Sequence, residues 1–247
     1  MEGGMDTYAL VLLFPLVFLA FNVRVVTGFG SAILLSPLLS NLLPPKDVVV
    51  LMILLESLIN LNFLLRERLT LRLGEVYAGG FAGIMAGMAL FGALSQRLIG
   101  LGIGAGMAAL SALMMRGVRF EVRRERPLLF FSGLISGLMG VLTGVNGPQI
   151  VLALSNQGYD AKFIRSFIIA YLIIIDTLIL LLFIALGYMS WEIVRIFAIL
   201  SPAVFLAHLT GRRLLGRMDS HSLRKAVLSV VLASSLVLVV RYSGVWA

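Results

Sequence analysis

The stretch TGFGSAILLSP, residues 27–37, places two glycines inside an apolar run that would otherwise continue as one helix. A similar stretch, TGVNGPQIVLA, occupies residues 143–153. Because glycine is unfavourable inside a helix, each stretch predicts that one helix ends there and another begins. These two breaks, and what surrounds them, decide how the chain folds.

The composition indicates which solvent surrounds most of the chain. Of 247 residues, 60% are hydrophobic and 13% are charged, and the mean hydropathy is +1.04. A soluble fold would leave too much apolar surface in water, and several apolar runs reach the roughly 20 residues that cross a hydrocarbon core. We therefore predict an all-α, multi-pass protein of the cell (inner or plasma) membrane, surrounded by the lipid bilayer.

The net charge of +8 is concentrated between the apolar runs. Basic residues cluster within 66–72, 116–126 and 212–225, as in cytoplasmic loops of membrane proteins. This interpretation is favoured over nucleic-acid binding. The chain has no cysteine and only two histidines, which excludes disulfides and thiolate-bound metals. We expect no metal and no cofactor.

Ten apolar segments can be delimited along the chain. They fall at roughly 7–26, 31–43, 47–65, 75–94, 98–115, 127–142, 147–157, 163–187, 191–210 and 225–241. The second and the seventh are too short to cross a bilayer at about 1.5 Å per residue. Both begin directly after a glycine-containing break.

The two halves of the chain match in hydropathy and in the positions of their glycine-containing breaks. A shift of 116 residues superposes the two breaks and places Asn60 on Asp176. The basic loops change sides between the halves, so we expect halves of opposite orientation, each with about five helical segments and an odd number of crossings. The predicted organisation is an N-terminal repeat (1–116), a basic cytoplasmic connector (117–126) and a C-terminal repeat (127–247).

The first two segments of each half cannot together form one bent crossing. As a single helix, residues 7–43 would extend about 55 Å, against a hydrocarbon core of about 30 Å. They form either two passes or a re-entrant hairpin, and both alternatives stay open. If both breaks dip inward, they approach one another near the middle of the membrane.

The breaks have the chemistry of an anion site. A helix that begins at a break presents free N–H groups and the positive end of its dipole, and a free amide in hydrocarbon requires a lined cavity. Neutral side chains nearby add donors for sulfite, sulfonate or carboxylate oxygens. The candidate substrate-binding residues are Arg24, Thr27, Gly28, Gly30, Ser31, Thr143, Gly144, Asn146, Gly147 and Gln149. The alternative is that the glycines only permit tight turns and that threonine and asparagine cap helices.

Two carboxylates lie well inside apolar segments, Glu56 in the third and Asp176 in the eighth. Intramembrane carboxylates are expensive enough to indicate function, and facing a cavity either could couple transport to protons. The alternative is a neutral or paired carboxyl that holds helices together, with Asn60 and Tyr171 as nearby partners.

A stripe of small residues marks a helix contact. Gly79, Gly83 and Gly87 recur every fourth residue. This spacing lets membrane helices approach closely, so we predict that the stripe packs against another helix.

The stretches TGFGSAILLSPLLSNLLPPKD (27–47) and SGLMGVLTGVNGPQIVLAL (136–154) resemble the TauE/SafE family of sulfite and organosulfonate exporters. The similarity extends over nearly the whole chain. Many members have a run of glycines where this chain has Gly30-Ser31-Ala32, and a second proline where Gln149 follows Pro148. The resemblance implies a transporter, not an enzyme, that exports sulfite, sulfoacetate or a similar small sulfur anion.

The function expected from the residues and the resemblance together is secondary transport by alternating access, with the anion bound at the paired breaks. An anion channel or a uniporter for other small oxyanions or carboxylates is the main alternative. An intramembrane enzyme has less support, because adjacent segments carry no paired-aspartate, HExxH or Ser–His constellation. The coupling ion, the direction of flux and the oligomeric state stay open.

Overall fold

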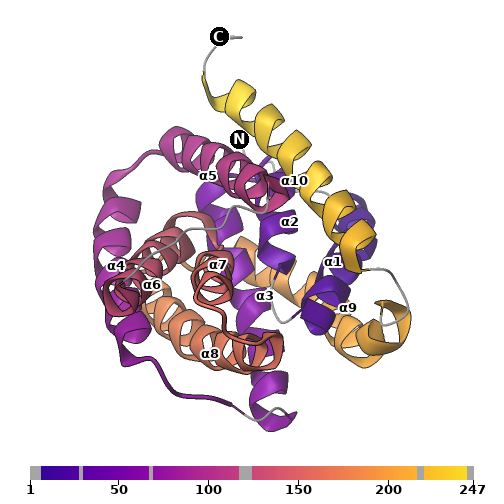
Figure 1. Cartoon of the computed structure of the whole chain (residues 1–247). Helices are drawn as coiled ribbons and strands as arrows, with labels where there is room; N and C mark the ends of the chain where they lie inside the picture. The colour runs from indigo at the N-terminus through magenta and orange to yellow at the C-terminus, as the bar shows by residue number, and fades with distance from the viewer. Residues whose placement is uncertain (1–6, 28–29, 67–68, 117–123, 216–219, 244–247) are drawn as a thin grey trace.

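The structure, a computed structural model, describes residues 7–27, 30–66, 69–116, 124–215 and 220–243, and this part of the chain is all-helical (Figure 1). The predicted all-α class is confirmed, and the ten predicted segments correspond in order to its helices. These are α1 Thr7–Thr27, α2 Ser31–Leu39, α3 Pro45–Arg66, α4 Gly74–Ala93, α5 Gln96–Arg116, α6 Glu125–Thr143, α7 Pro148–Asn156, α8 Ala161–Ala185, α9 Trp191–Leu215 and α10 Ser220–Ser243.

Helix lengths separate the membrane-crossing helices from the short ones. Within the described residues, six helices are long and apolar enough to cross a membrane, namely α3, α4, α5, α6, α8 and α9. Shorter apolar stretches occupy Leu13–Val25 in α1 and Val227–Ser243 in α10. The helices α2 and α7 have nine residues each and extend about 14 Å, less than half of a hydrocarbon core. The protein is therefore a multi-pass membrane protein with two short helices.

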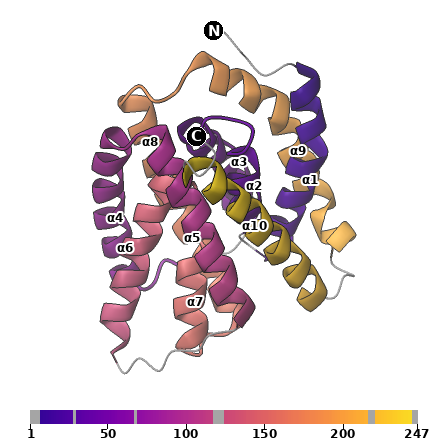
Figure 2. The same cartoon turned by 90° about the horizontal axis from the view of Figure 1, so that it is seen from above.

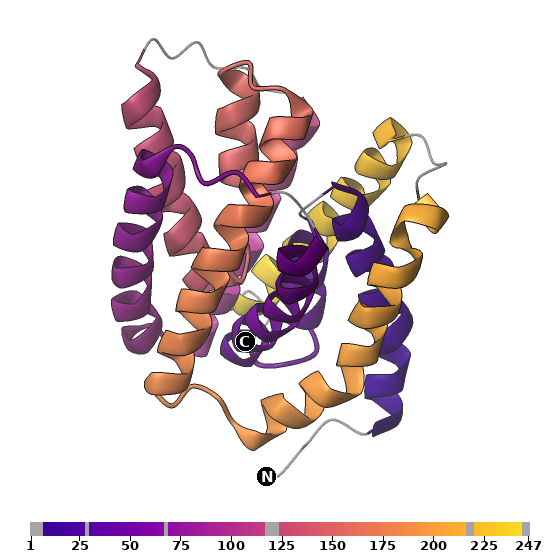
Figure 3. The ribbon, with the colours of Figure 1, turned by 90° about the horizontal axis from the view of Figure 1, so that it is seen from below.

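The long helices pack in pairs from distant parts of the chain. The pairs are α4 with α6, α1 with α9 and α5 with α10, while α3 and α8 cross in the interior. Figures 2 and 3 show α4 and α6 along one side of the molecule and α1 and α9 along the other. The short helix α2 packs against α1, α3 and α10, and α7 packs against α6 and α8. The short helix α2 is thus almost completely buried among long helices, whereas α7 is buried on the side that faces α6 and α8.

Glycines bring α4 and α6 into backbone contact. A β-carbon on Gly83 would lie 2.1 Å from the carbonyl oxygen of Leu134, and one on Gly137 would lie 2.2 Å from that of Gly80. No side chain fits at such distances, so the two helices touch through their main chains. The prediction that the Gly79–Gly87 stripe is a packing surface is confirmed.

The chain reverses between α6 and α7. Gly144 ends α6 with φ +73°, a left-handed conformation that costs glycine little. Beyond α7, the hydroxyl of Tyr159 donates a 2.6 Å hydrogen bond to Glu125, at the start of α6. This hydrogen bond raises the pKa of Tyr159 to about 12, so the hydroxyl stays protonated at neutral pH. The segments α6 and α7 therefore form a helical hairpin whose two ends lie together.

The backbone contact predicts that α4 tolerates no side chain at Gly83. The variant Gly83→Ala is expected to lose about 1–3 kcal/mol of folding free energy through overpacking, measured as a lower midpoint of thermal unfolding in detergent. Gly102→Ala in α5 is the matched control, because a β-carbon there meets nothing within 4 Å. Equal midpoints for the two variants would contradict the assigned contact.

Candidate functional site

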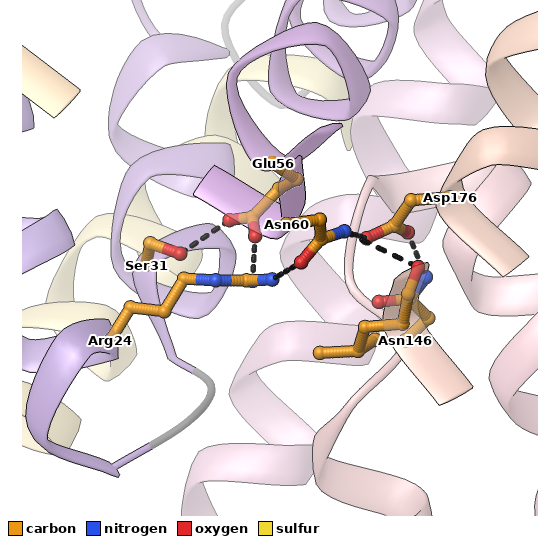
Figure 4. Close-up of polar contacts among 7 residues, drawn as sticks. Arg24, Ser31, Glu56, Asn60, Asn146 and Asp176 are labelled. Atoms are coloured by element: carbon orange, nitrogen blue, oxygen red, sulfur yellow. Dashed lines mark hydrogen bonds and ion pairs between the residues drawn. The ribbon is translucent and has the colours of Figure 1, made fainter. Parts of the chain in front are cut away.

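A buried group of six polar residues lies between the two breaks (Figure 4). Each residue is at most 6% exposed. They come from α1, α2, α3, α8 and the turn before α7, and their side chains point toward one another. We call this set the polar cluster: Arg24, Ser31, Glu56, Asn60, Asn146 and Asp176.

The half of the polar cluster near the first break is built on an ion pair. Arg24, one turn before the end of α1, pairs with Glu56 in the middle of α3. Ser31 is the first residue of α2, and its hydroxyl donates to the other carboxylate oxygen of Glu56. The turn between α1 and α2 includes Gly30 at φ +114°, where only glycine is comfortable. The turn thus places the Ser31 hydroxyl beside the ion pair.

Asn60 connects this ion pair to the second half of the polar cluster. Arg24 Nη2 donates to Asn60 Oδ1 over 2.6 Å, and Asn60 Nδ2 donates to Asp176 Oδ2 over 2.8 Å. A guanidinium has no acceptor, so the arginine determines which end of the Asn60 amide faces the carboxylate. Asn146 Nδ2 occupies the remaining oxygen, Asp176 Oδ1, over 2.5 Å. An unbroken chain of polar contacts therefore runs from Ser31 to Asn146.

Further hydrogen bonds hold the two breaks against each other. The hydroxyl of Ser36 in α2 donates to the carbonyl oxygen of Thr143 over 2.5 Å. Ser136 in α6 donates to the carbonyl oxygen of Asn146, and Tyr171 donates to the Ser136 hydroxyl over 3.1 Å. The backbone of the second break thus accepts hydrogen bonds from α2 and α6, and α8 is linked to it through the Ser136 hydroxyl.

The predicted residues of the first break are placed in part. Arg24 and Ser31 lie in the polar cluster, and Gly30 caps α2. Thr27 is the last residue of α1, but its side chain lies outside the described atoms, as does the whole of Gly28. The prediction of substrate contact at these residues is not tested by the geometry.

The predicted residues of the second break differ in what they contact. The Thr143 hydroxyl donates to Met139 and accepts from the amide of Val145, so it serves the end of the helix. A β-carbon on Gly144 would lie 3.1 Å from Met52, and Gly147 precedes Pro148 at the start of α7. The capping alternative fits Thr143, whereas Asn146 turns inward to Asp176.

Gln149 lies in the first turn of α7 and is half-buried. Its side-chain oxygen is buried and finds no hydrogen-bond partner in the described part of the chain. Buried polar atoms are nearly always paired, so an unpaired one requires an explanation. That oxygen is an acceptor, which an anion cannot use, so substrate contact at Gln149 stays a prediction that rests on its amide N–H groups.

Sequence reasoning assigned Asn60 only the role of a partner to a buried carboxylate. In the structure it joins Arg24 to Asp176. The available signal was the 116-residue shift, because that shift equates Asn60 with Asp176, the residue that it contacts. The supporting bonds of Ser36 and Ser136 have no comparable signal in the sequence.

The charges of the polar cluster do not cancel when every member is ionised. Arg24 is the one buried cation among the described residues, against the buried carboxylates of Glu56 and Asp176. An entering anion therefore meets a cation that is already paired. No group of three histidine or acidic side chains suited to a metal ion occurs in the described ranges.

The ion pair predicts non-additive effects of mutation. Arg24→Leu alone should cost roughly 3–5 kcal/mol, because it leaves Glu56 buried without a partner. The double variant Arg24→Leu/Glu56→Leu should lose less than the sum of the two single losses. Thermal unfolding of the four proteins in detergent measures this coupling, and additive losses would contradict it.

A family comparison covers the polar cluster and the helices around it. The family model described as "Sulfite exporter TauE/SafE" matches residues 13–238, from α1 to α10. No curated protein and no solved structure matches the chain in the corresponding comparisons. A match over nearly the whole chain, on an all-helical protein with six candidate spans, shows that the chain belongs to the TauE/SafE sulfite exporter family of membrane transport proteins.

Proposed function

We propose that the protein is a secondary transporter that exports small sulfur-containing anions, such as sulfite or organosulfonates, by alternating access. The observation that carries this proposal is the polar cluster, a continuous chain of contacts from Ser31 to Asn146 amid membrane-crossing helices. Ionisable residues inside the membrane are expensive and mark transport pathways. Family membership supports the sulfur-anion class.

Helix packing supports two inverted halves, residues 1–116 and 127–247. Exchanging the halves converts the α1–α9 pair into the α6–α4 pair, and converts the α3–α8 and α5–α10 pairs into themselves. A two-fold axis between inverted repeats produces such a pattern. Asn60 and Asp176, which the repeat equates, touch each other, as residues beside that axis would. We take the cluster as the fixed site around which the halves rearrange.

The hairpin of α6 and α7 favours the re-entrant alternative over two passes. Its two ends lie together at Glu125 and Tyr159, so it adds no net crossing. In this proposal α6, although long enough to span, returns through α7 to the side where it entered, and the second half crosses three times, through α8, α9 and the shorter apolar stretch of α10. That odd number agrees with the exchange of basic loops between the halves. We assign α1 and α2 the corresponding arrangement in the first half, and the basic connector at 117–126 the cytoplasmic side.

The anion is proposed to bind where the helices α2 and α7 begin. The first turn of each short helix supplies amide donors and the positive end of the dipole. Ser31, Asn146 and Gln149 add neutral donors, and Arg24 adds a charge with fork geometry. Sulfite and sulfonate groups carry three oxygens, which suits several donors converging from two helices.

Replacing Asn146 tests whether the second break belongs to the site. Asn146→Leu is expected to reduce saturable sulfite counterflow in proteoliposomes by about tenfold or more, because it leaves Asp176 short of a charge-assisted hydrogen bond. Membrane insertion should be unaffected. Asn62→Leu is the matched control, because the one hydrogen bond of the Asn62 amide within the described residues goes to Leu58 in its own helix.

Normal counterflow by Asn146→Leu would remove the second break from the site. An ohmic, non-saturating current in the wild type would contradict a transporter and indicate a channel. Both results come from the same vesicles.

The substrate class is tested by ligand-induced stabilisation of the purified protein. Sulfite, sulfoacetate or another sulfonate is expected to raise the thermal midpoint, since a ligand that binds only the folded state stabilises it. Acetate and chloride at the same ionic strength should raise it less. A larger shift with acetate than with every sulfur anion would contradict the assigned class.

A further inference from the structure

We propose that each anion enters the site together with a proton, and that Glu56 is the group that takes the proton. The inference rests on the proposed function and assigns its coupling ion. The anion replaces the Glu56 carboxylate on Arg24, so that one ion pair breaks and another forms. The displaced carboxylate gains an O–H bond to a proton from the aqueous phase to which the site is open.

The guanidinium of Arg24 is the part of the site that recognises the anion. Its Nη1 side faces Glu56 and its Nη2 donates to Asn60. Its Nε is buried and has no hydrogen-bond partner in the described part of the chain. Arg24 therefore keeps an unused donor. An anion gains the full charge interaction only by displacing Glu56, because no second buried cation lies among the described residues.

The charge balance requires a proton when this exchange occurs. Addition of a monoanion to a cluster with one cation and two carboxylates would leave two uncompensated charges. A buried carboxylate that loses its partner is costly, and proteins avoid the cost by neutralising it. With Glu56 protonated, the anion on Arg24 carries the charge that Glu56 carried before. One proton per monoanion thus keeps the net charge of the cluster constant.

Hydrogen-bond chemistry selects Glu56 rather than Asp176. Both oxygens of Asp176 accept from amide N–H groups of Asn60 and Asn146, and an N–H group cannot accept a carboxylic acid proton. Ser31, which donates to Glu56, can also accept, because a hydroxyl has lone pairs. Glu56 can therefore change from carboxylate to acid and keep its bond to Ser31. Asp176 would lose one of its two bonds.

The other ionisable groups near α3 lie away from Glu56. Arg165 of α8 and His208 of α9 both contact Phe63, two turns further along α3. The ionisable residues of α5, Arg97 and Arg116, lie at its two ends. Those of α6, Glu125 and Arg126, lie at its start. Only Arg24 of α1 and Asp176 of α8 belong to the same cluster as Glu56.

The same contacts argue against a metal cation as the coupling ion. Hard cations take several oxygen ligands with free lone pairs. The carboxylates of the cluster instead face donor groups: Glu56 is paired with the Arg24 guanidinium and accepts from the Ser31 hydroxyl, and Asp176 accepts from two amides. A proton needs only one acceptor.

The experiment counts protons per anion in the wild type and in two carboxylate-to-amide variants. The probes are 2-hydroxyethanesulfonate, a permanent monoanion that carries no proton of its own, and sulfite. Purified protein is titrated calorimetrically with each probe in two buffers of different ionisation enthalpy, which yields the protons taken up on binding. The same proteins are reconstituted with a pH indicator inside the vesicles.

The wild type is expected to take up about one proton per sulfonate. Its affinity for the sulfonate should therefore fall about tenfold for each unit that the pH rises, over the range in which Glu56 is ionised in the unbound protein. Glu56→Gln should bind and move the sulfonate with no proton uptake and with less than about a twofold change over the same pH range. Asp176→Asn alters the other carboxylate of the polar cluster, so its affinity should fall, but each sulfonate that it binds should still bring about one proton. For sulfite, the readout is the difference in proton uptake per anion between the wild type and Glu56→Gln.

Anion flux without proton uptake in the wild type overturns this inference and leaves the proposed function standing. Loss of the proton in Asp176→Asn but not in Glu56→Gln also overturns it. A wild type that shows no saturable flux of either probe overturns the proposed function and this inference with it.

Discussion

The ion pair between Arg24 and Glu56 is the interaction on which the rest of the site depends. Neither charge could stay buried alone, because the desolvation of an unpaired ion costs several kcal/mol. The pair therefore joins α1 to α3. Through its second nitrogen, Arg24 also orients Asn60 toward Asp176, which in turn holds Asn146. One guanidinium thus sets the geometry of both breaks.

Close packing around this centre comes from small residues rather than from hydrophobic drive. Lipid is as apolar as leucine, so helices in a membrane associate through van der Waals contact and hydrogen bonds. Glycines let α4 and α6 touch through their main chains, and α5 and α10 pack beside α2. The short helix α2 can then lie inside the bundle, and both short helices begin beside polar partners instead of hydrocarbon. The polar cluster lies in the space that this packing leaves between the helices.

Much of the fold could be predicted from particular residues. The short apolar segments predicted from residues 31 and 147 correspond to the nine-residue helices α2 and α7. The Gly79–Gly87 stripe predicted a helix contact that the structure contains. The site was less predictable. The position of Thr143 predicted a substrate-binding residue, but its hydroxyl bonds to backbone groups at the end of α6. Residue type does not distinguish Asn60 from Asn62, and only the 116-residue shift points to Asn60, which joins Arg24 to Asp176.

The sequence by itself determined the helices, their lengths and the membrane as their solvent, because hydropathy and glycine breaks act over neighbouring residues. Only the tertiary structure decided which buried polar and charged side chains contact one another. Arg24 and Asn60 are 36 positions apart, and Asn60 and Asp176 are 116 apart. Such pairings depend on how whole helices pack, and buried polar groups then select the arrangement in which each donor finds an acceptor. That arrangement joined residues of α1, α2, α3, α8 and the turn before α7 into one connected polar cluster.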